Sequence, residues 1–279
     1  MTTESVELRE VRGPSALGGG RRRSLELLYL MAATEFKRTY FGTALGYLWS
    51  LGRPLMLFAV LLAVFAQAFH FNVVPHYSVL LLFNIVLFGF FQEATNTAVP
   101  SIVSHEAIVR KTQFPRLVIP VSVVLTSLFN LGLNVVVTLA FILAFGVEPR
   151  LTWLLLPVIV LMLLVLTIAV SMILSSLYPR FRDLAIIWSV VSTALFYATP
   201  ILYAPERMSI HIRHVVALNP LTPIFALARK WVIDPDAPSP AALAGGQLRV
   251  LIPVALYIAI CAIAIVVFRR EAPRIAEAV

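Results

Sequence analysis

The sequence predicts an all-α protein that crosses a membrane several times, and composition and patterning both favour this class. Of 279 residues, 60% are hydrophobic and only 13% are charged, whereas soluble domains average about a quarter charged residues. The segments Leu117–Val147 and Leu151–Pro179 carry no formal charge, and each exceeds the roughly 20 residues that a helix needs to cross a bilayer. Because the apolar residues come in blocks rather than in alternation, a transmembrane β-barrel is disfavoured.

Six membrane spans divide the chain. They are predicted at Pro54–Phe69, Tyr77–Pro100, Leu117–Phe145, Leu151–Leu177, Leu184–Leu202 and Val250–Phe268. Residues 1–23 read as a flexible tail, because they contain acidic residues and a glycine run but no apolar core of a signal peptide. The sequence is therefore divided into the tail 1–23, an interfacial segment 24–53, a six-span region 54–268 and a second tail 269–279.

Positive charge gathers on one side of the predicted membrane. Sixteen of the 22 lysines and arginines fall in the two terminal regions and in the loops 101–116 and 178–183. Because cytoplasmic loops carry the excess of lysine and arginine, both termini are expected in the cytoplasm of a bacterial cell. The net charge of +8 follows from this bias, so it gives no support to nucleic-acid binding.

An amphipathic helix is expected to precede the first span, and Pro54 to open that span. From Ser24 onward the apolar residues recur three and four positions apart, which is the helical spacing. They are Leu25, Leu28, Tyr29, Ala32, Phe36 and Tyr40. The basic run Arg21–Arg23 should hold this helix on the anionic inner face of the membrane.

The two inner loops contain candidate contacts for a cytoplasmic partner. In the loop 101–116, Ser104 or His105 could start a short helix that ends at Pro115, which is either a solvated connector or a docking helix. Its contact residues would be His105, Glu106, Arg110, Lys111 and Phe114. In the loop 178–183, Arg182 reads as a topology anchor and Asp183 as the N-cap of the next helix.

The long outer loop 203–249 contains one further helical segment. Ile224–Ile233 is apolar but too short to span, so it is expected to be a re-entrant or an interfacial helix. In either case Arg229 and Lys230 should remain at the surface while Phe225 and Trp231 face inward.

Within the spans, Glu93 is the one formal charge that lies well inside, about 10 Å from the end of its helix at 1.5 Å per residue. It is either a functional group or the partner of a nearby arginine. Aromatic side chains stack on sugar rings, but they also pack against lipid and other helices. The aromatic residues of the spans therefore either line a channel or serve packing. The channel candidates are Phe88, Phe91, Glu93, Trp188, Ser192, Phe196 and Tyr197.

The order of motifs resembles a known family. The chain reads FKRTY…LGYLWSLGRPL, FGFFQE, IVRKTQFPRLVIP, YPRFRDL, ATPILY and LNPLTPIFALAR in succession. This order is similar to that of type-2 ABC permeases of the polysaccharide-exporting, Wzm-type group, including mycobacterial-type galactan exporters. The resemblance covers about residues 24–268. One departure concerns the family's tyrosine-arginine-aspartate pattern, because Pro179, Arg180 and Phe181 stand between Tyr178 and the pair Arg182-Asp183.

The resemblance implies a homodimer that forms a channel, with two cytoplasmic ATPase subunits that drive export of a lipid-linked polysaccharide. O-antigen, teichoic acid and galactan fit equally well as cargo. By the resemblance, the segment 104–114 together with Arg182 and Asp183 would couple to the ATPase, and the loop 203–249 would form an outer gate. The gate helix on the inner face would comprise Phe36, Lys37, Arg38, Tyr40 and Trp49.

ATP and Mg²⁺ are expected on the partner subunit, and no cofactor or metal on this chain. A phosphate-binding loop needs a lysine directly after a glycine, but Lys37, Lys111 and Lys230 follow phenylalanine or arginine. The single cysteine, Cys261, allows no intrachain disulfide.

Two other functions remain open at this point. An ion-coupled carrier would show charged sites near the middle of the membrane, and would work from a proton gradient without an ATPase. A membrane transferase for lipid-linked sugars would show a cluster of carboxylates and histidines, for which His211, His214 and Glu206 are the candidates. Turnover by the purified chain alone would favour the transferase.

Overall fold

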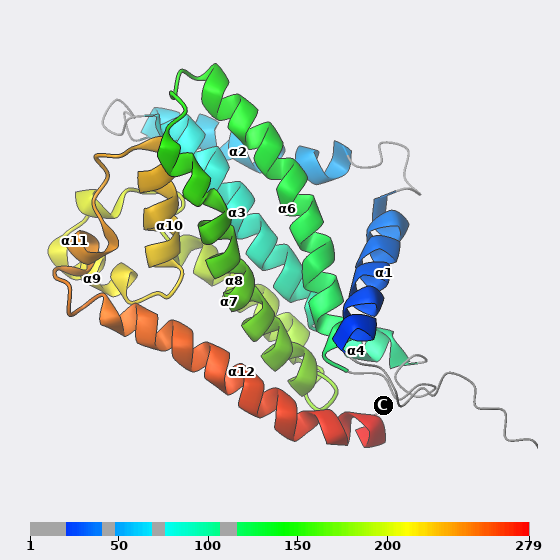
Figure 1. The fold of residues 1–279 in the computed structure, drawn as a ribbon. Coiled ribbons are helices and arrows are strands. Elements are labelled where there is room, and N and C mark those ends of the chain that lie inside the picture. The colour runs from blue at the N-terminus through cyan, green and yellow to red at the C-terminus, as the bar shows by residue number, and fades with distance from the viewer. Residues whose placement is uncertain (1–20, 41–47, 69–75, 107–115, 279) are drawn as a thin grey trace, which may run out of the picture.

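The computed structural model describes residues 21–40, 48–68, 76–106 and 116–278, and these residues form helices and connecting turns without a strand among them (Figure 1). The long helices are α1 (Arg21–Tyr40), α2 (Leu48–Ala68), α3 (Tyr77–Ala98), α6 (Val118–Ala144), α7 (Leu156–Leu177), α8 (Leu184–Ala198) and α12 (Leu251–Ala278). The short ones are α4 (Ser101–Ser104), the 3₁₀ turns η1 (Leu151–Leu155) and η2 (Pro205–Arg207), α9 (Ile210–Ala217), α10 (Thr222–Ala228), the π-helical turn η3 (Arg229–Ile233) and α11 (Pro240–Ala244).

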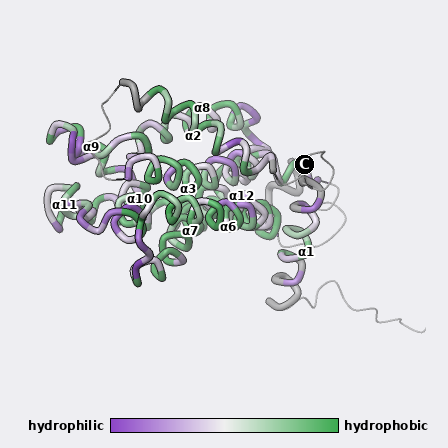
Figure 2. The backbone as a smooth tube through the Cα atoms, turned by 90° about the horizontal axis from the view of Figure 1, so that it is seen from above, coloured by the Kyte–Doolittle hydropathy of each residue, from purple (hydrophilic) through white to green (hydrophobic). Residues whose placement is uncertain are grey.

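Helix α3 forms the centre of the molecule, and 16 of its 22 residues are buried. Helices α2, α6, α7 and α8 pack against α3, α12 packs on α7, and α1 packs on α6. Figure 2 shows hydrophobic residues along α6, α7 and α8, whereas hydrophilic residues gather around α9. Between membrane helices, where lipid is as apolar as leucine, such contacts stabilise by van der Waals packing rather than by exclusion of water.

The membrane class predicted from sequence is confirmed. Four helical segments are long and apolar enough to cross a bilayer, by length and composition: Tyr77–Ala98, Val118–Ala144, Leu151–Leu177 and Leu251–Glu271. The segments Trp49–Val64 and Leu184–Ala198 are apolar but shorter. They coincide with the first and fifth predicted spans, so the count of six spans stays a prediction.

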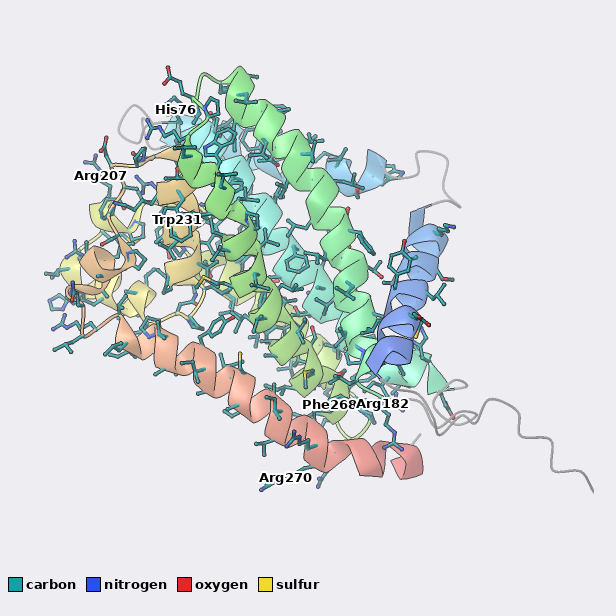
Figure 3. The ribbon with its side chains drawn as sticks, in the orientation of Figure 1. His76, Arg182, Arg207, Trp231, Phe268 and Arg270 are labelled. Atoms are coloured by element: carbon teal, nitrogen blue, oxygen red, sulfur yellow. The ribbon has the colours of Figure 1, made fainter. Side chains whose placement is uncertain are left out.

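The loops that were assigned to opposite sides of the membrane lie at opposite ends of the molecule. Figure 3 shows Arg182 and Arg270 at one end, beside the end of α12, and His76, Arg207 and Trp231 at the other. This separation fits the alternation of inner and outer loops that the charge distribution predicts. The end with Arg182 and Arg270 is called the basic end below.

Two predicted starts are wrong, and the first is that of α1, which begins at Arg21 rather than at Ser24. Helix α12 continues from the last predicted span to Ala278, through the segment 269–279 that was expected to be a tail. Alanine, glutamate and arginine in that tail are good helix formers, so the span continues as a helix beyond its apolar part. Pro54 lies inside α2 instead of opening the span, because its fixed φ suits a helix and membrane helices tolerate proline where neighbours satisfy the freed carbonyl.

The docking helix that was predicted to start at Ser104 or His105 stays a prediction, because the structure describes this loop only as far as Glu106, which is helical. Helix α4 ends at Ser104, and His105 closes it with its Nδ1 at 2.8 Å from the Ser101 carbonyl oxygen. Pro100 precedes α4, and a proline at the beginning of a helix needs no backbone N–H there. The remaining predicted contacts, Arg110, Lys111 and Phe114, lie outside the described residues.

Asp183 occupies the N-cap position of α8, as predicted, but its side chain makes no capping hydrogen bond. Its backbone is already helical, with φ −68° and ψ −14°, whereas a capping side chain folds back from an extended N-cap residue. The prediction that its side chain caps the helix is therefore wrong.

Arg229, in the outer loop, is buried, so the prediction that it remains at the surface is wrong. Helix α10 runs directly into the π-helical turn η3, which begins with Arg229. Only 9% of Arg229 is exposed, and its guanidinium donates to Glu206 at 2.6 Å and to Asp234 at 3.1 Å. Arginine was expected to remain at the surface, but two carboxylates from flanking turns compensate its charge and allow burial.

Candidate functional site

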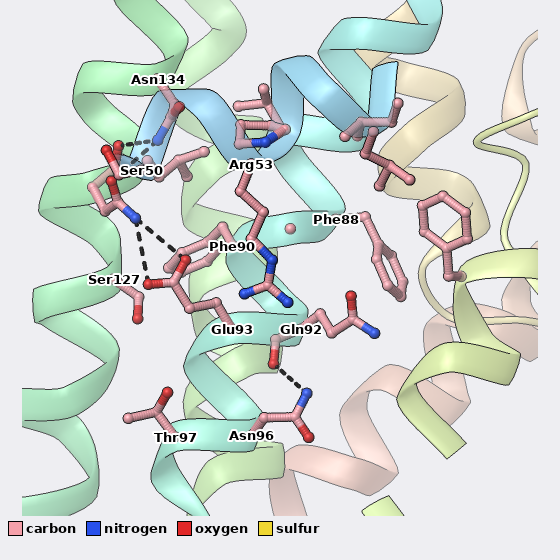
Figure 4. Close-up of a pocket in the computed structure, with 18 of the residues that line it drawn as sticks. Ser50, Arg53, Phe88, Phe90, Gln92, Glu93, Asn96, Thr97, Ser127 and Asn134 are labelled. Atoms are coloured by element: carbon pink, nitrogen blue, oxygen red, sulfur yellow. Dashed lines mark hydrogen bonds between the residues drawn. The ribbon is translucent and has the colours of Figure 1, made fainter. Parts of the chain in front are cut away.

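A polar cavity of about 550 Å³ lies among α2, α3, α6 and α8 (Figure 4). Such a volume is within the range of small-molecule sites, roughly 300–1,000 Å³. Eleven of the residues that line the cavity are polar or charged: Ser50, Arg53, Gln92, Glu93, Asn96, Thr97, Ser127, Asn130, Asn134, Ser189 and Thr193. Polar groups inside membrane helices are costly and mark functional pathways, so this cavity is the candidate site.

Helical spacing brings these polar groups together. On α3, Glu93 and Thr97 are four residues apart, and on α6, Asn130 and Asn134 are four residues apart. Side chains at i and i+4 lie on the same face of a helix. Since α3 and α6 pack against each other, their two polar faces meet at the cavity.

The carboxylate of Glu93 anchors a short hydrogen-bonded chain. The amide of Asn130 donates to the two carboxylate oxygens at 3.2 and 3.3 Å. The amide of Asn134 in turn donates to Asn130, at 3.1 Å to Oδ1 and 2.9 Å to the backbone carbonyl. The Oδ1 atom of Asn134 is buried and has no hydrogen-bond partner among the described residues.

Arg53 faces the same cavity from α2. Figure 4 shows its guanidinium beside Glu93 and Gln92, yet Arg53 makes no hydrogen bond or ion pair within the described ranges. Two roles were expected for Glu93, a functional group or the partner of a nearby arginine. Its hydrogen bonds come from the amide of Asn130, while the charge of Arg53 lies close enough to act on the carboxylate.

Hydrogen bonds also attach α8 to α3 at the edge of the cavity. The amides of Gln92 and Asn96 donate to Ser192 Oγ at 3.5 and 3.3 Å. The indole of Trp188 donates to Thr95 Oγ1 at 2.9 Å. These contacts fix the orientation of α8, which therefore presents Phe196 to the cavity.

Of the predicted channel residues, Phe88, Glu93 and Phe196 line the cavity. Phe91, Trp188 and Ser192 pack between α3 and α8 instead, with Phe91 and Trp188 edge to face at 6.3 Å between ring centroids. Tyr197 is 60% exposed on the outer face of α8. Whether a channel includes these residues stays a prediction.

The predicted gate residues divide between two helices. Trp49 lies in the first turn of α2 and lines the cavity, at 54% exposure. Lys37 is an exposed residue of α1. Phe36, Arg38 and Tyr40 belong to the same helix, whose backbone carbonyl at Ala32 accepts a hydrogen bond from Thr126 of α6 at 3.2 Å.

The predicted coupling residues that the structure describes lie near the basic end. His105 follows α4, with Glu106 next to it, and Arg182 and Asp183 are exposed before α8. The guanidinium of Arg182 stacks over the ring of Tyr178 at 5.3 Å. The altered spacing of this motif therefore still allows its tyrosine and arginine to meet.

The outer histidines do not form the cluster that a transferase would need. Glu206 is directed to Arg229, whereas His214 contacts Arg249 at 3.0 Å. In the described part of the chain, no three side chains of histidine, cysteine, aspartate or glutamate are grouped to hold a metal ion. Desolvation, and then the charges of Arg249, Arg213 and His211, lower the pKa of His214 below its ordinary value.

Sequence analysis missed Arg53, Asn130 and Asn134. A signal was present, because two asparagines four residues apart stand in a block of 31 uncharged, mainly apolar residues from position 117 to 147. An amide pair on one face of a membrane helix indicates a polar contact within the protein. What it contacts, however, depends on which helix packs against α6.

Comparison with known proteins assigns the chain to a family. The family profile described as ABC-2 type transporter matches residues 26–232. The chain belongs to the ABC-2 type transporter family. The resemblance to Wzm-type polysaccharide permeases is thereby confirmed, and the chain is a multi-pass membrane protein of the permease kind.

Individual proteins similar to this chain have a more specific name. Two proteins of Klebsiella pneumoniae, each an O-antigen export system permease protein RfbA, are 30% identical to this chain over 197 residues, which is 70% of this chain and 76% of each relative. A protein of the same name from Myxococcus xanthus is 29% identical over 230 residues, covering 81% of this chain and 88% of its own length.

Proposed function

We propose that this chain is the membrane subunit of an ATP-driven exporter that moves a lipid-linked polysaccharide of the O-antigen type across a bacterial cell membrane. The observation that carries the proposal is the match of the ABC-2 profile over residues 26–232, the segment that builds the polar cavity. The relatives named as O-antigen export permeases support the cargo class. Teichoic acid and galactan are alternative cargoes for the same machinery.

A second copy of the chain is proposed to complete the transport path. Of the 15 residues of α8, only Ser192 and Phe196 are buried, while Ile186 and Val190 are 69% and 65% exposed. Helix α2 likewise leaves Val60 61% exposed. Since α2 and α8 also wall the cavity, a partner copy seated on them would enclose it.

Two ATPase subunits are proposed to bind at the basic end. His105, Arg182 and Asp183 lie at this end. Closure of the ATPases on ATP would press on this end, and α3, which leads directly to α4, would transmit the displacement to the cavity wall.

The test is purification of the tagged chain in mild detergent with identification of the proteins that copurify, followed by reconstitution. The proposal expects a stoichiometric ATPase with a phosphate-binding loop, and glycan export that depends on ATP. Transport from a proton gradient without an ATPase would instead establish a carrier. Glycan turnover by the purified chain alone would establish a transferase.

The coupling segment has its own test, Arg110→Glu combined with Lys111→Glu. If acidic groups of the ATPase meet these cations, reversal creates like-charge contacts that cost several kcal/mol, so ATPase copurification should fall by about tenfold or more, at ~1.4 kcal/mol per factor of ten. The control is Arg150→Glu, which reverses a charge in the opposite, exposed loop. Unchanged copurification of the double variant, with membrane insertion intact, would refute the coupling role.

A further inference from the structure

We propose that the cavity among α2, α3, α6 and α8 is a binding subsite for an uncharged sugar unit, held by Glu93, Asn134 and Arg53. The inference rests on the proposed export function, because a glycan must be the cargo. It adds which part of the cargo is recognised, namely an uncharged sugar ring rather than a phosphate or pyrophosphate group between the glycan and its lipid, and which residues recognise it.

The first argument is an unused hydrogen-bond acceptor deep in the wall. Asn134 is only 7% exposed, and its Oδ1 has no partner among the described residues. Its amide nitrogen is fixed by two hydrogen bonds to Asn130, which directs the oxygen away from that residue. A buried acceptor without a partner costs free energy, and a ligand hydroxyl that donates to it removes this cost.

Further acceptors lie on α3. The Glu93 carboxylate offers about four lone-pair positions, but both of its hydrogen bonds from the protein come from the one amide group of Asn130. Gln92 and Asn96 use their amide nitrogens toward Ser192, at 3.5 and 3.3 Å, so their amide oxygens remain available. Acceptors thus dominate this wall, as a ligand rich in hydroxyl donors requires.

Arg53 supplies the complementary donors. A guanidinium has five N–H groups in a rigid fork. Arg53 lines the cavity and its charge acts on the Glu93 carboxylate, but no hydrogen bond ties its N–H groups to a described residue. A sugar hydroxyl both donates and accepts, so one hydroxyl can bridge Arg53 and the acceptors on α3. Figure 4 shows the guanidinium between the side chains of Glu93 and Gln92.

An apolar surface completes the wall. Phe88 and Phe196 both line the cavity and hold each other edge to face, with 5.4 Å between their ring centroids. Phe88 is fully buried and Phe196 is 9% exposed, so the two rings form an apolar boundary of the cavity. The C–H face of a pyranose would pack against this boundary while its hydroxyls reach the polar wall. Small-molecule sites generally combine such apolar surfaces with a few placed polar groups.

The charges that line the cavity disfavour a phosphate or pyrophosphate group. Its lining contains one cation, Arg53, and one carboxylate, Glu93, so the formal charges balance. A phosphate or pyrophosphate would be attracted by Arg53 but repelled by Glu93, and the amide oxygens offer it no donors. An uncharged ring meets no such repulsion.

The experiment is saturation-transfer NMR on the full chain in lipid nanodiscs. The probes are the methyl glycosides of galactose, glucose, mannose and rhamnose, with inorganic pyrophosphate as competitor. We expect saturation of at least one glycoside without displacement by pyrophosphate. Glu93→Gln and Asn134→Leu should each weaken binding by about tenfold, equivalent to ~1.4 kcal/mol, because each removes an acceptor while nearly keeping the size of the side chain.

The control variant is Thr126→Val, which removes a polar group from the same helix outside the cavity lining and should bind as the unmodified chain does. Size-exclusion profiles identify a variant that has not folded. If Asn134→Leu does not fold, Asn134→Thr takes its place, because its hydroxyl can donate to the Asn130 carbonyl oxygen and still accept from a ligand, and it should bind as the unmodified chain does. The inference is overturned if no glycoside is saturated, if pyrophosphate displaces the glycosides, or if both cavity variants bind like Thr126→Val.

The outcome separates this inference from the export function. An ATPase that copurifies and drives export, with glycoside binding absent or unaffected by Glu93→Gln, would refute the subsite and leave the exporter intact. Glycoside binding lost on Glu93→Gln, in a chain that has no ATPase partner, would keep the subsite and refute the exporter.

Discussion

The buried charge network of the outer loop allows a quantitative prediction. Arg229→Met removes the cation that stands between Glu206 and Asp234, while keeping a long side chain that fills most of the space. Side-chain exposure is 11% for Arg229 and Asp234 and 24% for Glu206, so two carboxylates with limited access to water lose their common partner. Breaking a buried ion pair in this way costs about 3–5 kcal/mol.

The exposure of Glu206 places the expected loss near the lower end, at about 3 kcal/mol. For a chain of this size, each kcal/mol corresponds to about 2–4 °C in Tm. We therefore expect Arg229→Met to unfold about 6–12 °C below the unmodified chain, by the same scale. The assay is thermal unfolding at fixed detergent concentration, followed by tryptophan fluorescence, because Trp231 lies in the same π-helical turn.

A neutral triple variant distinguishes charge from packing. Glu206→Gln and Asp234→Asn, added to Arg229→Met, leave no unpaired charge. In the native network, Glu206 Oε2 and Arg229 Nε already lack partners among the described residues, so the desolvation of the charges is not fully offset. The triple variant should therefore recover most of the loss. A single variant that melts with the unmodified chain, or a triple variant no better than the single, would refute this reasoning.

Two further predictions concern single contacts. Trp188→Phe and Thr95→Val each remove one partner of the hydrogen bond between α8 and α3, so each should lower stability by about 0.6 kcal/mol, the average for hydrogen bonds between membrane helices. In a double-mutant cycle, the two losses should not add. Simple additivity would show that the two side chains share no hydrogen bond. The pKa of His214 is lower in the folded chain than in the unfolded chain, where it returns to its ordinary value. As pH falls, the unfolded chain therefore binds the proton first, and the free energy of unfolding decreases from about pH 6.5 downward. Arg249→Gln should raise the pKa of His214 and reduce the loss of stability at acid pH. Histidine NMR titration and unfolding measurements between pH 5 and about 7 would test this. An unchanged titration would show that Arg249 does not lower the pKa of His214.

Local sequence properties predicted the helices well because membrane helices are specified by local hydrophobicity. The third predicted span, Leu117–Phe145, differs from α6 by one residue at each end. The fourth, Leu151–Leu177, coincides with η1 and α7. Errors occurred where a polar or proline residue was taken as a boundary, as at Pro54, which lies within α2.

The candidate site was predicted only in part. Glu93 stood out because a charge within an apolar span is conspicuous in any sequence, and the aromatic residues Phe88 and Phe196 followed from composition. Asn130 and Asn134 gave no comparable signal, since an uncharged amide in a span is satisfied by whatever helix faces it. Their role became visible only when α6 was placed against α3.

The sequence by itself determined the membrane class and the order of the helices, because both follow from local hydrophobicity, and its motif order indicated the family. Tertiary structure decided which polar groups share a cavity and which are buried. Arg229 shows the physical reason: whether an arginine stays at the surface depends on the carboxylates that the fold brings to it. Such pairings between distant segments have no local signature, and they govern both the outer network and the cavity.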